Sequence, residues 1–259
     1  MESMTEQALV IGQEEISEGI FSLWLLSKQI ALQSKSGQFV CAYSKDHSRL
    51  LPRPISICEA DRDGGKLRLV YRVAGEGTKE FSALKKGDTL RLLGPLGNGY
   101  PSGETLMEKQ PFVLVGGGIG IPPLLQLAKD LPGEKIMVLG YRDKLFLQED
   151  FAPLGTVVIA TEDGSAGVRG NVIDAMRACS IRPGVLLACG PMPMLRGLKQ
   201  YAQQTGTPCY LSLEERMACG MGACLACVCK TNEKDAHTQV HNRRICKEGP
   251  VFNVEDVCI

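Results

Sequence analysis

Four cysteines in the last fifth of the chain have the spacing of an iron–sulfur site. Cys219, Cys224 and Cys227 form a C-x4-C-x2-C motif, and Cys246 follows at a distance. This is the order in which thiolates hold a [2Fe–2S] cluster. The two glycines between Cys219 and Cys224 would let backbone N–H groups approach the sulfurs and tune the cluster. The motif therefore predicts a carrier of single electrons.

Three cysteines compete to be the fourth ligand. Cys229 lies only two residues beyond Cys227, in a segment that is expected to be extended, and Cys258 is one residue from the end of the chain, where chains commonly fray. Cys246 follows an apolar residue and leads into a turn. Cys246 is the expected ligand.

Zinc is the alternative metal at these residues. Cys224 and Cys227 are followed by His237 and His241, which is a two-cysteine, two-histidine order. The central gap of nine residues is shorter than such fingers use, and zinc would leave Cys219 without a role. A zinc-binding interaction module therefore stands as the second alternative function.

A glycine-rich turn directly follows the continuous apolar run 112–115. Its glycines are Gly116, Gly117, Gly118 and Gly120, and Pro122 then suits the first turn of a helix. Such a turn lets the pyrophosphate of a dinucleotide approach the backbone at the start of the helix. A second turn, at Cys189 and Gly190, ends another apolar strand of the same sheet. These turns predict a dinucleotide site.

A third group of residues lies in the N-terminal part of the chain. An arginine followed three residues later by a hydroxyl could bind phosphate and touch a ring, and Thr78 is expected to be the N-cap of a short helix that starts after glycines. Taken alone, the first segment also fits an ordinary strand. The group comprises Arg53, Pro54, Ile55 and Ser56, then Val70, Tyr71 and Arg72, and then Gly77 and Thr78.

The pattern of elements that must position these residues changes along the chain. Short strands with Gly and Pro turns predict a small antiparallel β barrel, whereas apolar strands that alternate with helices predict a parallel α/β sheet. The expected barrel strands are 20–26, 38–43, 55–58, 66–73 and 88–93. The expected sheet strands are 112–115, 135–140, 156–160 and 185–189, with helices at 122–131, 170–179 and 191–204. The expected domains are 1–102, 103–208 and a Cys-rich third domain at 209–259.

Composition excludes several classes of function. The net charge is zero without a run of Lys or Arg, so neither nucleic acid nor an anionic membrane is an expected partner. The N-terminus is acidic and lacks an apolar segment, and no apolar run is long enough to span a bilayer. Of the 11 cysteines, seven are scattered outside the motif, several in apolar segments. This pattern predicts a reducing, cytoplasmic location.

Together, the three groups of residues resemble the ferredoxin–NADP reductase superfamily. Within it, the chain looks closest to the electron-transfer subunits of two-subunit, NAD-dependent (class 1B) dihydroorotate dehydrogenases, the PyrK family. The resemblance covers nearly the whole chain. It rests on the segments 53–56, 116–123 and 215–227.

The resemblance implies a role for each group. Arg53 to Ser56, with Val70 to Arg72 and Gly77–Thr78, would form an FAD site, although Ile55 replaces the aromatic residue that the superfamily usually has there. Gly116 to Gly120 would face a nicotinamide dinucleotide, and Cys189–Gly190 would lie near its nicotinamide. The four motif cysteines would ligate the cluster.

The resemblance also implies a function. The chain would pass electrons from the FMN of a catalytic subunit, through the cluster and FAD, to NAD⁺ in pyrimidine (UMP) biosynthesis. No acid or base for pyrimidine oxidation stands out in this chain, so no catalytic residue is expected. The partner subunit would form a heterotetramer with two copies of each subunit. Apolar Met217, Met221 and Leu225 would either supply a docking surface for it or pack internally.

An alternative function comes from the same superfamily. The small subunit of an NADH-dependent ferredoxin:NADP oxidoreductase, or of a sulfide dehydrogenase, is built on the same plan. There the resemblance implies an acidic first ligand to the cluster. Cys219 at that position favours dihydroorotate dehydrogenase.

Overall fold

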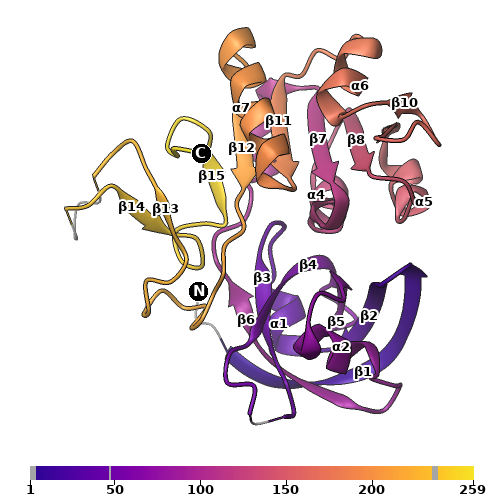
Figure 1. The fold of residues 1–259 in the computed structure, drawn as a ribbon, viewed down its shortest axis with the longest axis vertical. Helices are drawn as coiled ribbons and strands as arrows, with labels where there is room; N and C mark the ends of the chain where they lie inside the picture. The colour runs from indigo at the N-terminus through magenta and orange to yellow at the C-terminus, as the bar shows by residue number, and fades with distance from the viewer. Residues whose placement is uncertain (1–3, 47, 235–238) are drawn as a thin grey trace.

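The first six strands close into an antiparallel barrel (Figure 1). The computed structural model describes residues 4–46, 48–234 and 239–259. Around the barrel the strands follow the order β1-β2-β5-β4-β3-β6, and the expected barrel is confirmed. The strands are β1 (Met4–Ser17), β2 (Ile20–Leu26), β3 (Phe39–Tyr43), β4 (Arg53–Asp61), β5 (Lys66–Arg72) and β6 (Thr89–Leu96). Two short helices, α1 (Lys28–Gln33) and α2 (Glu76–Ser82), lie between them in sequence.

The long strand β1 is not among the segments expected from the sequence. It pairs with β2 along one edge and with β6 along the other, and so it closes the barrel. Most of its side chains are exposed or half-buried, and only Ala8 and Val10 are fully buried. The apolar alternation that reveals a strand is therefore weak in this segment.

The second part of the chain forms a seven-stranded sheet. Its order is β10-β9-β8-β7-β11-β12-β15, and every neighbouring pair is parallel except β12 with β15. The strands are β7 (Phe112–Gly117), β8 (Lys135–Tyr141), β9 (Thr156–Thr161), β10 (Val168–Arg169), β11 (Val185–Cys189), β12 (Cys209–Ser212) and β15 (Val251–Asn253). The predicted parallel α/β sheet is confirmed.

Helices cover both faces of this sheet. Buried side chains of α6 (Val172–Ala178) and α7 (Met192–Thr205) pack on one face, and those of α4 (Pro123–Asp130) and α5 (Gln148–Phe151) pack on the other. The three longer helices lie where the sequence predicts them. Shorter helical segments are α3 (Gly103–Leu106), η1 (Met107–Lys109), η2 (Gly118–Gly120) and η3 (Ala152–Leu154).

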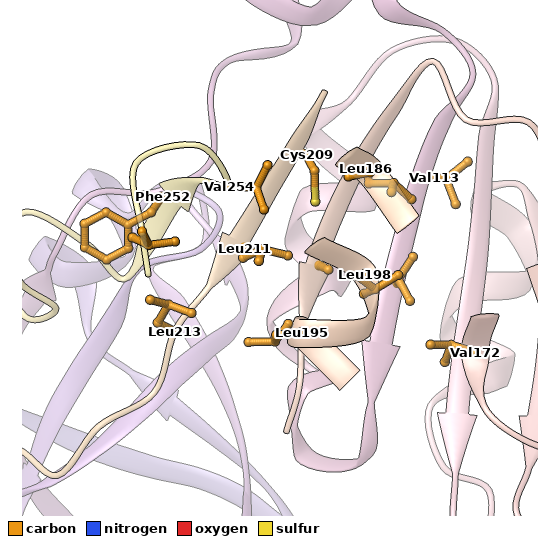
Figure 2. Close-up of a cluster of buried hydrophobic side chains, with 14 of the residues drawn as sticks. Val113, Val172, Leu186, Leu195, Leu198, Cys209, Leu211, Leu213, Phe252 and Val254 are labelled. Carbon is orange, nitrogen blue, oxygen red and sulfur yellow. The ribbon is translucent and has the colours of Figure 1, made fainter. Parts of the chain in front are cut away.

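The C-terminal segment is built onto the sheet. Its strand β15 adds to the edge of β12, and a two-stranded hairpin, β13 (Val228–Lys230) with β14 (Asn242–Arg244), lies outside the sheet. Figure 2 shows Phe252 and Val254 continuing the row of buried side chains that starts under α7. The C-terminal segment thus shares a core with the α/β sheet.

Polar contacts fix the barrel against the sheet. The side chain of Gln126 in α4 accepts a hydrogen bond from the backbone N–H of Ala60 at 2.7 Å. Arg68 in β5 donates to Asp150 in α5 at 2.6 Å and to the Ser22 hydroxyl at 3.0 Å, and its side chain is only 8 % exposed. Among the described residues, no helix is long and apolar enough to cross a membrane.

Replacing Arg68 with alanine should destabilise the protein by about 2–4 kcal/mol, because Asp150 would lose its cation and Ser22 its donor in a largely buried position. Unfolding of the cofactor-loaded protein in urea measures this loss. Lys66→Ala is the matched control on the same strand. Its ion pair with Asp61 spans 3.5 Å between half-exposed groups, so the expected change is within about 0.5 kcal/mol. Equal losses for both variants would contradict the role given to Arg68.

Candidate iron–sulfur and dinucleotide sites

The cysteine motif lies in the loop between β12 and β13, and backbone amides surround its first sulfur. Cys219 Sγ accepts hydrogen bonds from the N–H groups of Ala223 at 3.3 Å and Cys224 at 3.4 Å. Across the site, Cys227 Sγ accepts from the N–H of Cys246 at 3.4 Å. Such N–H···S contacts are a known means of setting a cluster's potential.

The four thiols are arranged as two pairs. Cys219 contacts Cys224, whose backbone N–H donates to Cys219 Sγ, and Cys246 contacts Cys227, since the N–H of Cys246 donates to Cys227 Sγ. Cys227 and Cys246 are each 2 % exposed, whereas Cys224 is exposed and Cys219 is half-buried. A [2Fe–2S] cluster with four cysteine ligands takes two thiolates on each iron. The two pairs therefore fit such a cluster.

The pKa values of the pair members differ. Burial opposes the Cys219 thiolate, but hydrogen bonds from the backbone N–H groups of Cys224 and Met221 outweigh burial and lower its pKa to about 6. Burial and then the neighbouring Cys227 raise the pKa of Cys246 to about 12. In the metal-free chain, these shifts favour the thiolate form of Cys219 and the thiol form of Cys246.

Alkylation of the metal-free chain at pH 7 should modify Cys219 well before Cys246, since the thiolate is the nucleophile. The folded-state pKa of Cys219 lies below its usual value, so the rate should be near its plateau at pH 7. It should fall as the pH drops through about 6. Peptide mapping after short iodoacetamide pulses measures both sites. Modification of Cys246 first would contradict the geometry of the loop.

The competing ligands lie elsewhere. Cys229 is on β13 opposite Arg243, and burial raises its pKa to about 11. The Cys258 thiol donates a hydrogen bond to Asn232 Oδ1 at 2.8 Å. The choice of Cys246 stays a prediction that these positions favour.

The histidines of the zinc alternative give it little support. His237 lies outside the described residues, and His241 is exposed. Within the described part of the chain, no three His, Cys, Asp or Glu side chains are grouped to hold a single ion. A [2Fe–2S] site does not need such a group of three, because each iron takes only two protein ligands.

A cavity of about 610 Å³ opens between the sheet and the barrel. It lies at the carboxyl ends of the parallel strands, where open α/β sheets bind ligands. Of the predicted residues, Gly117, Gly118, Gly120, Gly190 and Arg72 line it. This brings the glycine turns of β7 and β11 together with the end of barrel strand β5.

Two predicted residues of this group do not line the cavity. Gly116 packs beneath Ile121, where an added Cβ would lie 2.9 Å from that side chain. Cys189 is fully buried, and burial raises its pKa. Gly116 and Cys189 therefore lie beneath the glycine turns and do not face the cavity.

The close approach of the two turns requires glycine. A Cβ on Gly120 would lie 2.4 Å from the carbonyl oxygen of Cys189, and Gly118 has a φ of +52°. The guanidinium of Arg72 lies 3.9 Å from where a Cβ on Gly118 would be. The turn thus presents backbone next to a cation, as a pyrophosphate site needs.

Glu214 also lines the cavity, and the sequence analysis does not single it out. Partial desolvation by the protein around it raises the pKa of the Glu214 carboxyl group, and the residue remains exposed at the cavity wall. Glu214 lies two residues beyond β12, and β12 is not among the strands expected from the sequence.

The predicted flavin residues lie on β4, β5 and α2. Arg53 packs its guanidinium on Gly77, since a Cβ there would lie 2.6 Å from Arg53 Nε. Arg53 and Pro54 also line a second, more open hollow of about 570 Å³, with Arg216 and Met217 from the segment that leads to Cys219. The flavin motif and the cysteine loop are therefore neighbours.

The N-cap prediction for Thr78 is wrong. Gly75 is the N-cap of α2, and Thr78 lies three residues later, where its hydroxyl accepts hydrogen bonds from the N–H groups of Ala74 at 2.9 Å and Gly75 at 3.2 Å. Thr78 still stabilises the start of the helix, because at position N3 its hydroxyl accepts a hydrogen bond from the backbone N–H of the N-cap residue Gly75.

Some of the other predicted flavin residues are buried in the barrel, and others lie at its surface. Ile55 and Tyr71 are buried in the barrel core, and the Tyr71 hydroxyl donates to Gln13 Oε1 at 2.9 Å. Val70 is buried as well, whereas Pro54 is exposed and Ser56 is half-buried. The exposed face of β4 is thus formed by Pro54 and Ser56.

Two protein-family profiles match the chain. Residues 7–100 match the oxidoreductase FAD-binding domain. Residues 214–258 match the iron–sulfur cluster binding domain of dihydroorotate dehydrogenase B. These domains and the fold define a flavin- and iron–sulfur-binding oxidoreductase subunit of the ferredoxin-reductase type.

Curated relatives match over the full length. The electron transfer subunit of dihydroorotate dehydrogenase B (NAD(+)) from Geobacillus kaustophilus (strain HTA426) is 42% identical, with 98% of each chain covered. That from Listeria monocytogenes serotype 4a (strain HCC23) is 42% identical, with 96% of this chain and 97% of the relative covered. The chain belongs to the family of electron transfer subunits of dihydroorotate dehydrogenase B (NAD(+)).

Solved structures share the fold. A structure of an NADH-dependent reduced ferredoxin-NADP oxidoreductase is 28% identical, with a TM-score of 0.85 over 98% of this chain and 90% of the other. The ferredoxin reductase of carbazole 1,9a-dioxygenase has a TM-score of 0.68 at 17% identity, over 80% of this chain and 68% of the other. The second likeness is one of fold alone.

Proposed function

We propose that this chain carries electrons between the FMN of a dihydroorotate dehydrogenase catalytic subunit and NAD⁺. The observation that carries the proposal is the spatial order of three sites on one chain: the cysteine loop, the flavin motif and the dinucleotide cavity. The two thiol pairs lie beside the flavin motif, and Arg72 of the barrel reaches the glycine turn of the nicotinamide domain. FAD in the middle would supply the exchange between single electrons and a hydride, because a nicotinamide takes two electrons at once.

The residues of the chain act by binding and orienting. Cys219, Cys224, Cys227 and Cys246 would hold the cluster, with Ala223 and Cys224 donating N–H groups to the first sulfur. Arg53 and Gly77 would hold the FAD phosphates, and the face of β4 that carries Ser56 would meet the ring.

The dinucleotide would bind in the cavity of about 610 Å³. Its pyrophosphate would lie on the turn that contains Gly118 and Gly120, beside Arg72. Its nicotinamide would lie near Gly190, within reach of the open carboxyl group of Glu214. No step of pyrimidine oxidation is assigned to this chain.

Exposed apolar side chains on the cysteine loop support docking of the catalytic subunit. Met221 is 51 % exposed and Leu225 is 58 % exposed. Met217 is half-buried and packs against the core, so we assign it to the interior of the loop and not to the docking surface. A heterotetramer with two copies of each subunit is part of this proposal, as are its cytoplasmic location and the absence of nucleic-acid and membrane partners.

The three-domain division also stays a proposal. The family matches at 7–100 and 214–258 support the barrel and the iron–sulfur part. Strands β12 and β15 tie residues 209–259 to the sheet of 103–208, so we expect these two parts to unfold together.

The small subunit of an NADH-dependent ferredoxin:NADP oxidoreductase is the second candidate, favoured by the TM-score of 0.85 with that structure. The cysteine in the first ligand position and the relatives at 42% identity favour dihydroorotate dehydrogenase over it.

The purified chain alone tests the cofactor assignment. We expect a visible spectrum of flavin plus [2Fe–2S], release of FAD by acid, and oxidation of NADH with artificial acceptors such as ferricyanide. Recovery of FMN alone, or of a colourless protein that contains zinc, would contradict the proposal.

A further inference from the structure

We propose that Cys41, a barrel residue outside the ligand motif, positions the iron–sulfur loop against the flavin-binding strands and thereby sets the properties of the cluster and its exchange with the flavin. This inference rests on the proposed function. Cys41 is a positioning residue, because it acts through the loop that holds the ligands.

The contact is direct and leaves no spare room. Cys41 is fully buried on β3, and a Cβ on Gly220 would lie 2.5 Å from its sulfur. Gly220 is itself buried and has a φ of +70°, so the loop turns sharply where it meets the barrel. Gly220 directly follows the first ligand, Cys219. A shift at Cys41 would therefore move the ligand loop.

The same residue lies next to the flavin motif. In the pairing of β3 with β4, Cys41 is opposite Pro54 and Ala42 is opposite Arg53. Cys41 thus stands between the cysteine loop and the first half of the Arg53–Ser56 segment. Leu96 of β6 also faces Gly220, at 3.3 Å from the same Cβ position, but β6 pairs with β1 and β3 and not with β4.

Chemistry favours a thiol at this position. Cys41 is fully buried, and its sulfur lies against Gly220, the residue that follows the first proposed ligand. A thiol is a weak hydrogen-bond donor, and a donor close to the ligand loop favours the more negative, reduced state of a cluster. It also fills a space that cannot accept a larger side chain without moving Gly220.

The test uses the full chain with its cluster and FAD. The variants are Cys41→Ala, which removes the sulfur, Cys41→Val, which adds bulk, and Cys41→Ser, which keeps a donor. Cys58→Ala and Cys58→Ser are matched controls, because Cys58 is equally buried on β4 but packs in a core cluster that contains none of the ligand cysteines. The readouts are the EPR spectrum and midpoint potential of the cluster, and the stopped-flow rates of FAD and cluster reduction by NADH.

We expect Cys41→Ala to lower the midpoint potential and Cys41→Val to change the EPR line shape, each with several-fold slower cluster reduction. FAD reduction by NADH should keep its wild-type rate, and both controls should match wild type. Cys41→Ser should shift the midpoint potential by less than Cys41→Ala does, but still measurably. Wild-type spectra, potentials and rates in Cys41→Ala and Cys41→Val would overturn the inference.

If only Cys41→Ser retains a cluster, its potential compared with that of Cys58→Ser decides. A shift specific to Cys41→Ser supports the inference, and identical potentials overturn it. Failure of the proposed function itself is distinct from either outcome, since the wild-type chain would then lack the cluster or the FAD before any variant is compared.

Discussion

Cys246→Ser should lose the reduced-cluster EPR signal or shift it strongly, together with the visible absorbance of the cluster. The Cys246 thiol is 2 % exposed and is paired with that of Cys227, while its backbone N–H donates to Cys227 Sγ at 3.4 Å. With the proposed ligand set, removing its sulfur would leave one iron with a single thiolate. Iron and sulfide analysis with EPR of the dithionite-reduced protein measures the loss.

Cys229→Ser is the matched control for the ligand assignment. Cys229 is two residues from Cys227 but lies on β13, paired with Arg243, and it should leave the signal and the iron content unchanged. If Cys229→Ser destroyed the signal and Cys246→Ser did not, the ligand set would be wrong.

Arg53→Ala should weaken FAD binding by about tenfold to a hundredfold, because a charge-assisted hydrogen bond contributes about 1.5–3 kcal/mol. The guanidinium packs on Gly77 and lines the hollow that reaches the cysteine loop. Titration of flavin-free protein with FAD, followed by fluorescence quenching, gives the affinity.

Lys79→Ala is the control for the flavin site. Lys79 is on the same short helix as Gly77, but its side chain is 70 % exposed, and its ion pair within the described residues is with Glu76, at 3.9 Å. Its FAD affinity should stay within twofold of wild type, roughly the effect of an exposed ion pair. If the Arg53→Ala and Lys79→Ala variants bound FAD equally well, the proposed role of Arg53 in the flavin site would be wrong.

Local patterns in the sequence were sufficient for much of this structure. Alternating β-rich segments predicted the barrel, and apolar runs that end in glycine predicted strands β7 and β11 with their turns. The C-x4-C-x2-C spacing predicted a loop that gathers thiols, because ligand spacing is a local property of the chain.

Contacts between distant segments were not predictable in this way. Strand β1 buries few of its side chains, and it is a strand because β2 and β6 pair with both of its edges. Strand β15 joins the sheet through β12, and three residues carry too little periodicity to reveal it. Thr78 has the residue type of an N-cap, yet the extended backbone of Gly75 begins the helix. The role proposed for Cys41 depends on its contact with Gly220, which is distant in sequence and so could not be predicted from local patterns.

Electron transfer from dihydroorotate to NAD⁺ tests the central claim most directly. The chain should be purified alone and together with an FMN-bearing dihydroorotate dehydrogenase catalytic subunit, and NADH formation should be followed at 340 nm after addition of dihydroorotate and NAD⁺. The chain alone should form no NADH, whereas the complex should form it and should lose this activity with Cys246→Ser. Dihydroorotate oxidation by the chain alone, or a fully loaded complex that reduces no NAD⁺, would contradict the account.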